Sequence, residues 1–146
     1  MFKKILLDTH ITKNIMDSSQ NGNLTVIWRD WDNLIDSPKM IYITSVFPGE
    51  VKGPHLHLKR DSYFLCIEGK VMFVIMDENG IYHEIEADSN NPFLLYVPKN
   101  IASAHININK EISKVLVLAN LAWRPNDNEM KNVSFDNYNW KKFQVK

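Results

Sequence analysis

Features that would set this chain apart from ordinary globular proteins are scarce. Cys66 is its one cysteine, so no intrachain disulfide can form, and its apolar neighbours favour a buried, inert thiol. No apolar run approaches the length that spans a membrane, and the apolar residues after Lys4 are too few for a signal peptide. We therefore expect a cytoplasmic protein with no membrane partner.

Neither sign of charge is in excess. Lys and Arg together number 17, as do Asp and Glu, so the net charge is zero and nucleic acid is not the expected partner. The chain also lacks a Gly-rich phosphate loop, a Cys-x-x-Cys pair and a serine nucleophile elbow, so the enzyme classes built on those motifs have no support. Its 146 residues, of which 45% are hydrophobic, predict a single domain over residues 1–146.

What the chain does contain is a series of short segments rich in β-branched and aromatic residues. None of them carries the apolar stripe of an amphipathic helix. Strands are expected over residues 4–7, 24–29, 40–47, 63–67, 70–77, 81–86, 93–97, 102–108 and 112–119. This pattern predicts an all-β sandwich or barrel.

Turn residues separate the expected strands. Asn21-Gly22-Asn23 is expected to turn the chain between the first two strands, and residues 32–39 are expected to form a loop. Asn79-Gly80 predicts a tight hairpin after residue 77. The tail after residue 119 is expected to be a loop with one short helical turn.

The stretch around His55 and His57 is the candidate functional centre. The two histidines are two residues apart, so in an extended strand both imidazoles lie on the same face. Gly53-Pro54 directly before them indicates a special backbone conformation. Three cations lie within a few residues: Lys52, Lys59 and Arg60. Imidazoles beside cations suit an anionic substrate and proton transfer.

The spacing of these residues resembles the two cupin motifs. The first motif, Gly-x5-His-x-His-x4-Glu-x6-Gly, is matched by Gly49, His55, His57 and Gly69, with Ser62 at the Glu position. The second motif, Pro-x-Gly-x2-His-x3-Asn, is matched by Pro98 and Asn107, with Asn100 at the Gly position and Ser103 at the His position. The resemblance implies a cupin-type double-stranded β-helix, or jelly-roll barrel. Because two of the four metal ligands expected of a metal cupin are missing, no metal site is expected.

Within the cupins, the chain resembles the dTDP-4-keto-6-deoxyglucose 3,4-ketoisomerases and, more distantly, the dTDP-4-dehydrorhamnose 3,5-epimerases. In the ketoisomerase pattern a Tyr-Ile strand leads into Arg-Gly-x-His-Ala-His-Lys, and here Tyr42-Ile43 leads at the same spacing into Lys52-Gly53-Pro54-His55-Leu56-His57-Leu58. Leu95-Tyr96-Val97-Pro98 and Asp136-Asn137-Tyr138 resemble later parts of that pattern. Lys52 in place of Arg and Ala102-Ser103 in place of an aromatic-His pair are departures from it.

The resemblance implies proton transfer next to a ketone on a nucleotide-diphosphate sugar, with no cofactor. The expected catalytic residues are His55, His57 and Tyr42. One imidazole carries the proton between carbons and the other orients it or donates to oxygen; we favour His57 as the base, although the sequence does not rank the two. The expected substrate-binding residues are Lys52, Lys59, Arg60, Tyr96, His105 and Trp123.

Other readings stay open at this point. The first is a 3- or 3,5-epimerase acting on the same class of substrate. The second is a non-catalytic cupin that binds a sugar or nucleotide, which the missing second-motif residues favour. The third is a metal-dependent cupin enzyme. Residues 71–76 are apolar on both faces of the expected strand, and this predicts a homodimer in which strands pair across subunits.

Overall fold

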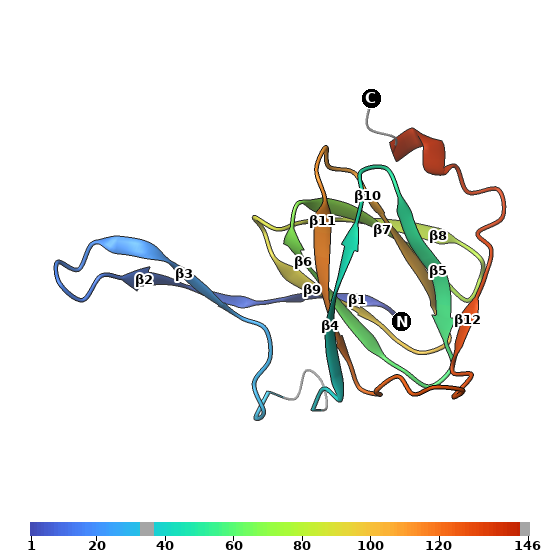
Figure 1. Cartoon of the computed structure of the whole chain (residues 1–146), viewed down its shortest axis with the longest axis horizontal. Helices are drawn as coiled ribbons and strands as arrows, with labels where there is room; N and C mark the ends of the chain where they lie inside the picture. The colour runs from blue at the N-terminus through green and yellow to red at the C-terminus, as the bar shows by residue number, and fades with distance from the viewer. Residues whose placement is uncertain (33–36, 144–146) are drawn as a thin grey trace.

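The computed structural model describes residues 1–32 and 37–143 and is almost entirely β (Figure 1). Its strands are β1 (Lys3–Leu6), β2 (Asp8–Lys13), β3 (Gln20–Val26), β4 (Met40–Val46), β5 (Val51–His57), β6 (Ser62–Glu68), β7 (Lys70–Met76), β8 (Tyr82–Asp88), β9 (Phe93–Val97), β10 (Ala102–Asn107), β11 (Ser113–Ala119) and β12 (Met130–Asn132). A short 3-10 helix, η1 (Trp140–Phe143), lies in the tail. No helix in the described ranges is long and apolar enough to cross a membrane.

Two five-stranded antiparallel sheets face each other and form the barrel (Figure 1). The first sheet has the order β1-β9-β6-β11-β4, and the second has the order β12-β5-β10-β7-β8. Except for β7 and β8, strands adjacent in each sheet are not consecutive in the chain, as in β9-β6-β11, which is the crossing pattern of a jelly roll. The expected all-β, cupin-type architecture is confirmed.

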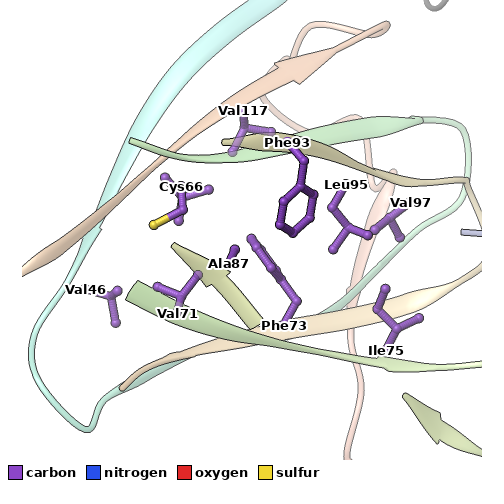
Figure 2. Close-up of a cluster of buried hydrophobic side chains, with 11 residues drawn as sticks. Val46, Cys66, Val71, Phe73, Ile75, Ala87, Phe93, Leu95, Val97 and Val117 are labelled. Carbon is purple, nitrogen blue, oxygen red and sulfur yellow. The ribbon is translucent and has the colours of Figure 1, made fainter. Parts of the chain in front are cut away.

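The main core fills the space between the sheets, as Figure 2 shows. Val117 enters it from the first sheet and Phe73 from the second, with Phe93 and Leu95 of β9 beside them. Phe73 is 1% exposed and Leu95 is completely buried. Alternate residues of each strand supply this core, because successive side chains of a strand lie on opposite faces of its sheet.

The outer face of β7 explains why that strand is apolar on both sides. Val74 is completely buried in a separate cluster with Ala102, Ala104 and Phe135, the last of which belongs to the C-terminal tail. β7 also lies between β10 and β8, so both of its edges are paired within the chain. The sequence-based reason for strand pairing across subunits through residues 71–76 is therefore wrong, since the chain covers these residues itself.

The N-terminal region differs from the expectation. Residues 21–23 do not form a turn but lie inside β3, where Gly22 pairs with Thr12 of β2. The turn lies over residues 14–19, where the side chain of Asn14 accepts a hydrogen bond from Met16 N and that of Asp17 accepts one from Ser19 N. These side-chain hydrogen bonds stabilise a turn at residues 14–19, whereas Asn21-Gly22 had predicted a turn at residues 21–23. The loop expected over residues 32–39 falls in part on residues 33–36, which lie outside the described residues.

Candidate active site

A pocket of about 280 Å³ lies between the two sheets, close to the histidines of β5. Its polar lining comes from Tyr42, Thr44, Lys52, His55, His57, Arg60, Ser103 and His105. Its apolar lining includes Phe64, Phe73 and Val117, which continue into the main core. The pocket therefore joins a cluster of imidazoles and cations to an apolar floor, which is the general composition of a small-molecule site.

The backbone of β5 positions the histidines. Gly53 has φ of +90°, and a Cβ at this position would lie 2.9 Å from the carbonyl oxygen of Ser103 on β10. Only glycine permits this close approach, so the expected special backbone at Gly53-Pro54 is confirmed. His55 pairs with Ser103 in the register, and both histidines line the pocket as the alternation of the strand predicts.

His57 has hydrogen-bond partners at both ring nitrogens. Its Nδ1 lies 2.7 Å from Oε1 of Glu129, and its Nε2 lies 2.8 Å from Nη2 of Arg60. Burial lowers the pKa of His57 below its ordinary value, and the Arg60 charge adds to this, although Glu129 opposes it. The neutral ring thus carries its proton on Nδ1, which donates to Glu129, while Nε2 accepts from Arg60.

Glu129 is a buried carboxylate, 7% exposed, with three donors around it. Burial alone would raise its pKa, but hydrogen bonds from His57 and from the backbone N–H groups of Lys59 and Arg60 outweigh burial and hold the pKa below its usual value. The two backbone donors lie 3.1 and 3.2 Å from Oε2. The carboxylate is therefore ionised at neutral pH and fixes the His57 tautomer.

Arg60 links the two sheets inside the pocket. Its side chain is buried, and Nη2 donates to Tyr42 Oη over 3.1 Å as well as to His57 Nε2. The guanidinium also lies 5.7 Å from the centre of the Tyr42 ring. Its Nε has no hydrogen-bond partner within the described residues. Arg60 therefore brings a buried positive charge to the wall of the pocket.

His55 is held at one nitrogen. Its Nδ1 lies 3.0 Å from Oδ1 of Asn132, and because an amide oxygen only accepts, Nδ1 carries the proton. No hydrogen bond to Nε2 is formed by any residue in ranges 1–32 and 37–143. His55 lines the pocket, so this nitrogen offers a lone pair there. The two histidines of one strand therefore differ in which nitrogen is available.

His105 is the third imidazole of the pocket. It is 5% exposed, packs against Phe73 with ring centres 5.5 Å apart, and its Nε2 has no partner in the described part of the chain. Burial lowers its pKa to about 4, and the charges of Lys52 and His55 contribute in the same direction. His105 is therefore neutral at physiological pH and places a polar atom at the apolar floor.

Three residues expected to bind substrate lie outside the pocket lining. Lys59 is exposed and contributes its backbone N–H to Glu129 instead of its side chain to the site. Tyr96 lies on the outer face of the first sheet, 5.0 Å from the Tyr63 ring, because Leu95 and Val97 take the inward positions of β9. Trp123 is 66% exposed in the loop after β11.

Sequence reasoning missed the two residues that hold the histidines. Glu129 and Asn132 come from the polar tail, where β12 pairs with β5 so that Asn132 faces His55 and Met130 faces His57. A three-residue strand of exposed polar and apolar side chains has no periodicity that predicts it. The one available signal was an acidic residue near a β-sheet edge, which is too common to single out Glu129.

The residues present do not form a cluster of metal ligands. Within the described ranges, no three His, Cys, Asp or Glu side chains are grouped to hold a metal ion. Ser62 is buried in β6 at the position where a metal cupin has its glutamate. The second-motif position holds Ser103, and its hydroxyl is a poor ligand compared with imidazole.

Comparison with known proteins assigns the chain to a family. Residues 7–140 match the family described as FdtA: WxcM-like, C-terminal. The chain belongs to the FdtA family. A curated relative is SpsL, a spore coat polysaccharide biosynthesis protein of Bacillus subtilis (strain 168). It is 22% identical over 143 residues, which cover 89% of this chain and 93% of SpsL.

Solved structures support the same fold for this FdtA-family chain. A dTDP sugar isomerase from Desulfovibrio desulfuricans G20 superposes with a TM-score of 0.81 at 16% identity, covering 96% of this chain and 90% of that one. QdtA, a sugar 3,4-ketoisomerase from Thermoanaerobacterium thermosaccharolyticum in complex with TDP, superposes with a TM-score of 0.71 at 16% identity, covering 97% and 90%. The resemblance to sugar-nucleotide cupins drawn from the sequence is confirmed.

Proposed function

We propose that this chain is a cofactor-independent isomerase of a nucleotide-linked keto sugar, a 3,4-ketoisomerase of the dTDP-4-keto-6-deoxyhexose type. The observation that carries this proposal is the Nε2 of His55, which has no hydrogen-bond partner among the described residues, in a pocket that also presents Arg60 and Tyr42. Membership of the FdtA family, together with SpsL and the QdtA structure, supports a role in deoxysugar or surface-polysaccharide biosynthesis.

His55 acts as the base in this proposal. Its Nε2 takes the proton from C3 of the sugar, and the C–H electron pair forms a double bond to C4 while the C4 oxygen becomes an anion. The same imidazolium then returns the proton to C4. The hydroxyl proton moves from the C3 oxygen to the C4 oxygen, so that the ketone ends at C3. No atom or electron is gained or lost overall.

Arg60 and Tyr42 stabilise the anion that forms on oxygen. A buried guanidinium acts strongly on a developing charge because little water screens it. Arg60 already occupies Nε2 of His57, so that nitrogen is not free to accept a proton from carbon. This is why we assign the base to His55 and give His57 the task of orienting Arg60, which reverses the sequence-based preference.

Two other residues bind the substrate in this proposal. Lys52 lies exposed at the lining of the pocket and is placed to contact the diphosphate. His105 offers a hydrogen-bonding nitrogen at the floor to a hydroxyl or ring oxygen of the sugar. Lys59, Tyr96 and Trp123 lie outside the lining and have no role in it.

We also propose that the chain acts as a homodimer in the cytoplasm. The β2–β3 hairpin stands away from the barrel (Figure 1), and its tip residues Ile15 and Met16 are 97% and 88% exposed. An isolated two-stranded hairpin is marginally stable in water, so a second copy is expected to cover it. The edge strand β4, whose Ile41 and Ile43 are each 57% exposed on the outer face, is a candidate surface for that contact.

An epimerase remains the second candidate because of where the acid and base stand. Tyr42 comes from the first sheet and His55 from the second, so a sugar between them has one on each side. Removal of a proton by His55 and return from Tyr42 on the opposite face would invert one carbon instead of moving the ketone.

Incubation with dTDP-4-keto-6-deoxyglucose in deuterated water separates these functions. A ketoisomerase yields a 3-keto product, with deuterium at C4 only to the extent that the His55 proton exchanges with solvent before it is returned, whereas an epimerase keeps the 4-keto group and gains deuterium at the inverted carbon; NMR distinguishes them. The His55→Asn variant is the control for enzyme-dependent exchange. Tight binding with neither exchange nor product would overturn both proposals and indicate a non-catalytic binding protein. Activity that depends on added metal would indicate the metal-dependent alternative.

A further inference from the structure

We infer that the C-terminal segment of residues 129–143, here called the strap, positions both pocket histidines, and that three aromatic rings on the back of the second sheet hold it in place. The rings are Phe135, Tyr138 and Trp140, here called the aromatic anchor. The inference rests on the proposed function only in giving the histidines a chemical task. The geometry that it describes exists in the protein without substrate.

The first end of the strap reaches the histidines. Glu129 contacts Nδ1 of His57 and Asn132 contacts Nδ1 of His55, so both tautomers are set by residues of one short segment. The backbone joins them, since Leu58 N donates to Glu129 O over 2.8 Å and Val133 N donates to Pro54 O over 3.3 Å. If the strap separates from β5, both imidazoles lose their Nδ1 hydrogen-bond partners at the same time.

The pairing of β12 with β5 is too slight to hold the strap alone. β12 has three residues, all of them exposed, and it is the edge strand of the second sheet. Its Met130 side chain is 44% exposed. Short edge strands with exposed side chains separate easily from their sheet, because little buried apolar area becomes exposed to water when they do.

The second end of the strap is the aromatic anchor. Phe135 is 7% exposed and packs with Val74, Ala102 and Ala104 on the outer face of the second sheet. Trp140 stacks on Phe135 with ring planes 5° apart and meets Tyr138 edge-on at 4.6 Å. The ring of Tyr82 lies 5.1 Å from that of Phe135. Tyr82 belongs to β8, the edge strand opposite β12 in the second sheet, so the anchor also contacts that edge. Figure 1 shows the strap running from β12 past β5 to this position.

Polar contacts add direction to the anchor. Tyr138 Oη donates to Oε1 of Glu84 over 2.6 Å, and Tyr82 Oη donates to the backbone oxygen of Asp136 over 2.9 Å. Lys142 forms an ion pair with the same Glu84 carboxylate and lies over the Tyr138 ring. These polar contacts hold the anchor against the outer face of the second sheet. Phe135 follows Asn132 by only three residues. Little slack separates the anchor from the residues that contact the histidines.

Two variants test this inference in the full chain and in a shortened one. The Tyr138→Ala/Trp140→Ala double variant keeps the buried Phe135, and truncation after Val133 keeps Glu129 and Asn132 while removing the whole anchor. Phe47→Ala, an exposed aromatic outside the strap, is the matched control. If the truncated chain does not fold, the double variant decides.

The readout needs no substrate. Nitrogen-15 NMR of the imidazoles should show the Nδ1–H tautomer at His55 and His57 in the parent, and a mixture with the Nε2–H tautomer at His55 in both variants, whereas the Arg60 hydrogen bond to Nε2 should keep His57 in its parent tautomer. Exchange of the Leu58 amide, which donates to Glu129, should quicken by about tenfold, the scale set by losing aromatic pairs. Folded variants that keep the parent tautomers and the Leu58 protection would overturn the inference.

Turnover supplies a second, separable test. If the anchor acts through the strap residues, its removal should lower kcat by about tenfold with little change in KM. In a Glu129→Ala/Asn132→Ala background the same removal should add clearly less, because both contacts that the anchor protects have already gone. An undiminished effect in that background would contradict the inference. Absence of turnover in the parent chain would overturn the proposed function and leave the NMR test intact.

Discussion

The two halves of the pocket, around His57 and around His55, differ in how many hydrogen-bond partners the imidazole has. His57 has a carboxylate on one nitrogen, a guanidinium on the other, and a pKa that burial lowers. His55, two residues earlier on the same strand, has one amide partner and a nitrogen left for a ligand. The two histidines of this one motif therefore have different roles, and the sequence does not show the difference.

The difference shows how a strand can place two identical side chains for different tasks. The pleat gives both imidazoles the same direction, and the neighbouring segments then decide which nitrogen each can use. A fully satisfied imidazole is a rigid support, whereas a half-satisfied one can exchange a proton. The predictions below are arranged to test this division.

The largest effect is expected from removing the imidazole that has the free nitrogen. His55→Asn should lower kcat by about 10² to 10⁴, the usual contribution of a general base, and leave the thermal unfolding midpoint nearly unchanged. His57→Asn should act more weakly on kcat but reduce stability, because Glu129 and Arg60 lose a buried partner. Steady-state kinetics with calorimetry measures both. A larger kcat loss in His57→Asn would reverse the assignment.

His105, the third imidazole, shows the effect of burial on a histidine pKa separately from the effect of hydrogen-bond partners. The pKa of His105 is lowered to about 4 from an ordinary value of 6.5, so between these pH values the unfolded chain binds a proton that the folded chain excludes. The free energy of unfolding should therefore fall as pH drops from 7 to 4, by about 3 kcal/mol for this group. Urea unfolding of parent and His105→Gln should show a shallower pH dependence in the variant. Parallel curves would contradict the assignment.

The two partners of His57 should move its pKa in opposite directions. Glu129→Gln removes the negative charge that raises the pKa of His57, so that pKa should fall further. Arg60→Gln removes a charge that lowers the pKa of His57, so that pKa should rise. NMR titration of the ring protons tests both. An unchanged pKa in both variants would show that burial alone sets the value.

The smallest effect is expected outside the pocket. Tyr96→Phe removes a hydroxyl on the outer face of the first sheet and should change kcat/KM by less than about twofold. The sequence alone expected this residue to bind substrate. A loss of tenfold or more in the same kinetic assay would show that Tyr96 reaches the ligand after all.

The parts of the molecule that the sequence predicted are those with local causes. The strand over residues 40–47 and the common face of His55 and His57 follow from alternation within a few residues, and both are confirmed. The sequence did not indicate which face of β9 Tyr96 takes, because residues 93–97 are apolar or aromatic on both faces and both faces pack against other residues.

The partners of the histidines had no local cause. Asn132 lies 77 residues after His55, and Glu129 lies 72 residues after His57. Their pairing depends on β12 docking at a sheet edge, and that docking depends on aromatic residues further along the tail. β2 was missed for a similar reason, because its polar residues form a strand only through pairing with β3.

The late position of Glu129 has a consequence for biosynthesis. During translation the barrel strands through β11 are synthesised before Glu129 and Asn132, so both pocket histidines gain their Nδ1 partners only after the strand that carries them has been made. A chain released before Glu129 would therefore lack the residues that hold His55 and His57 at Nδ1.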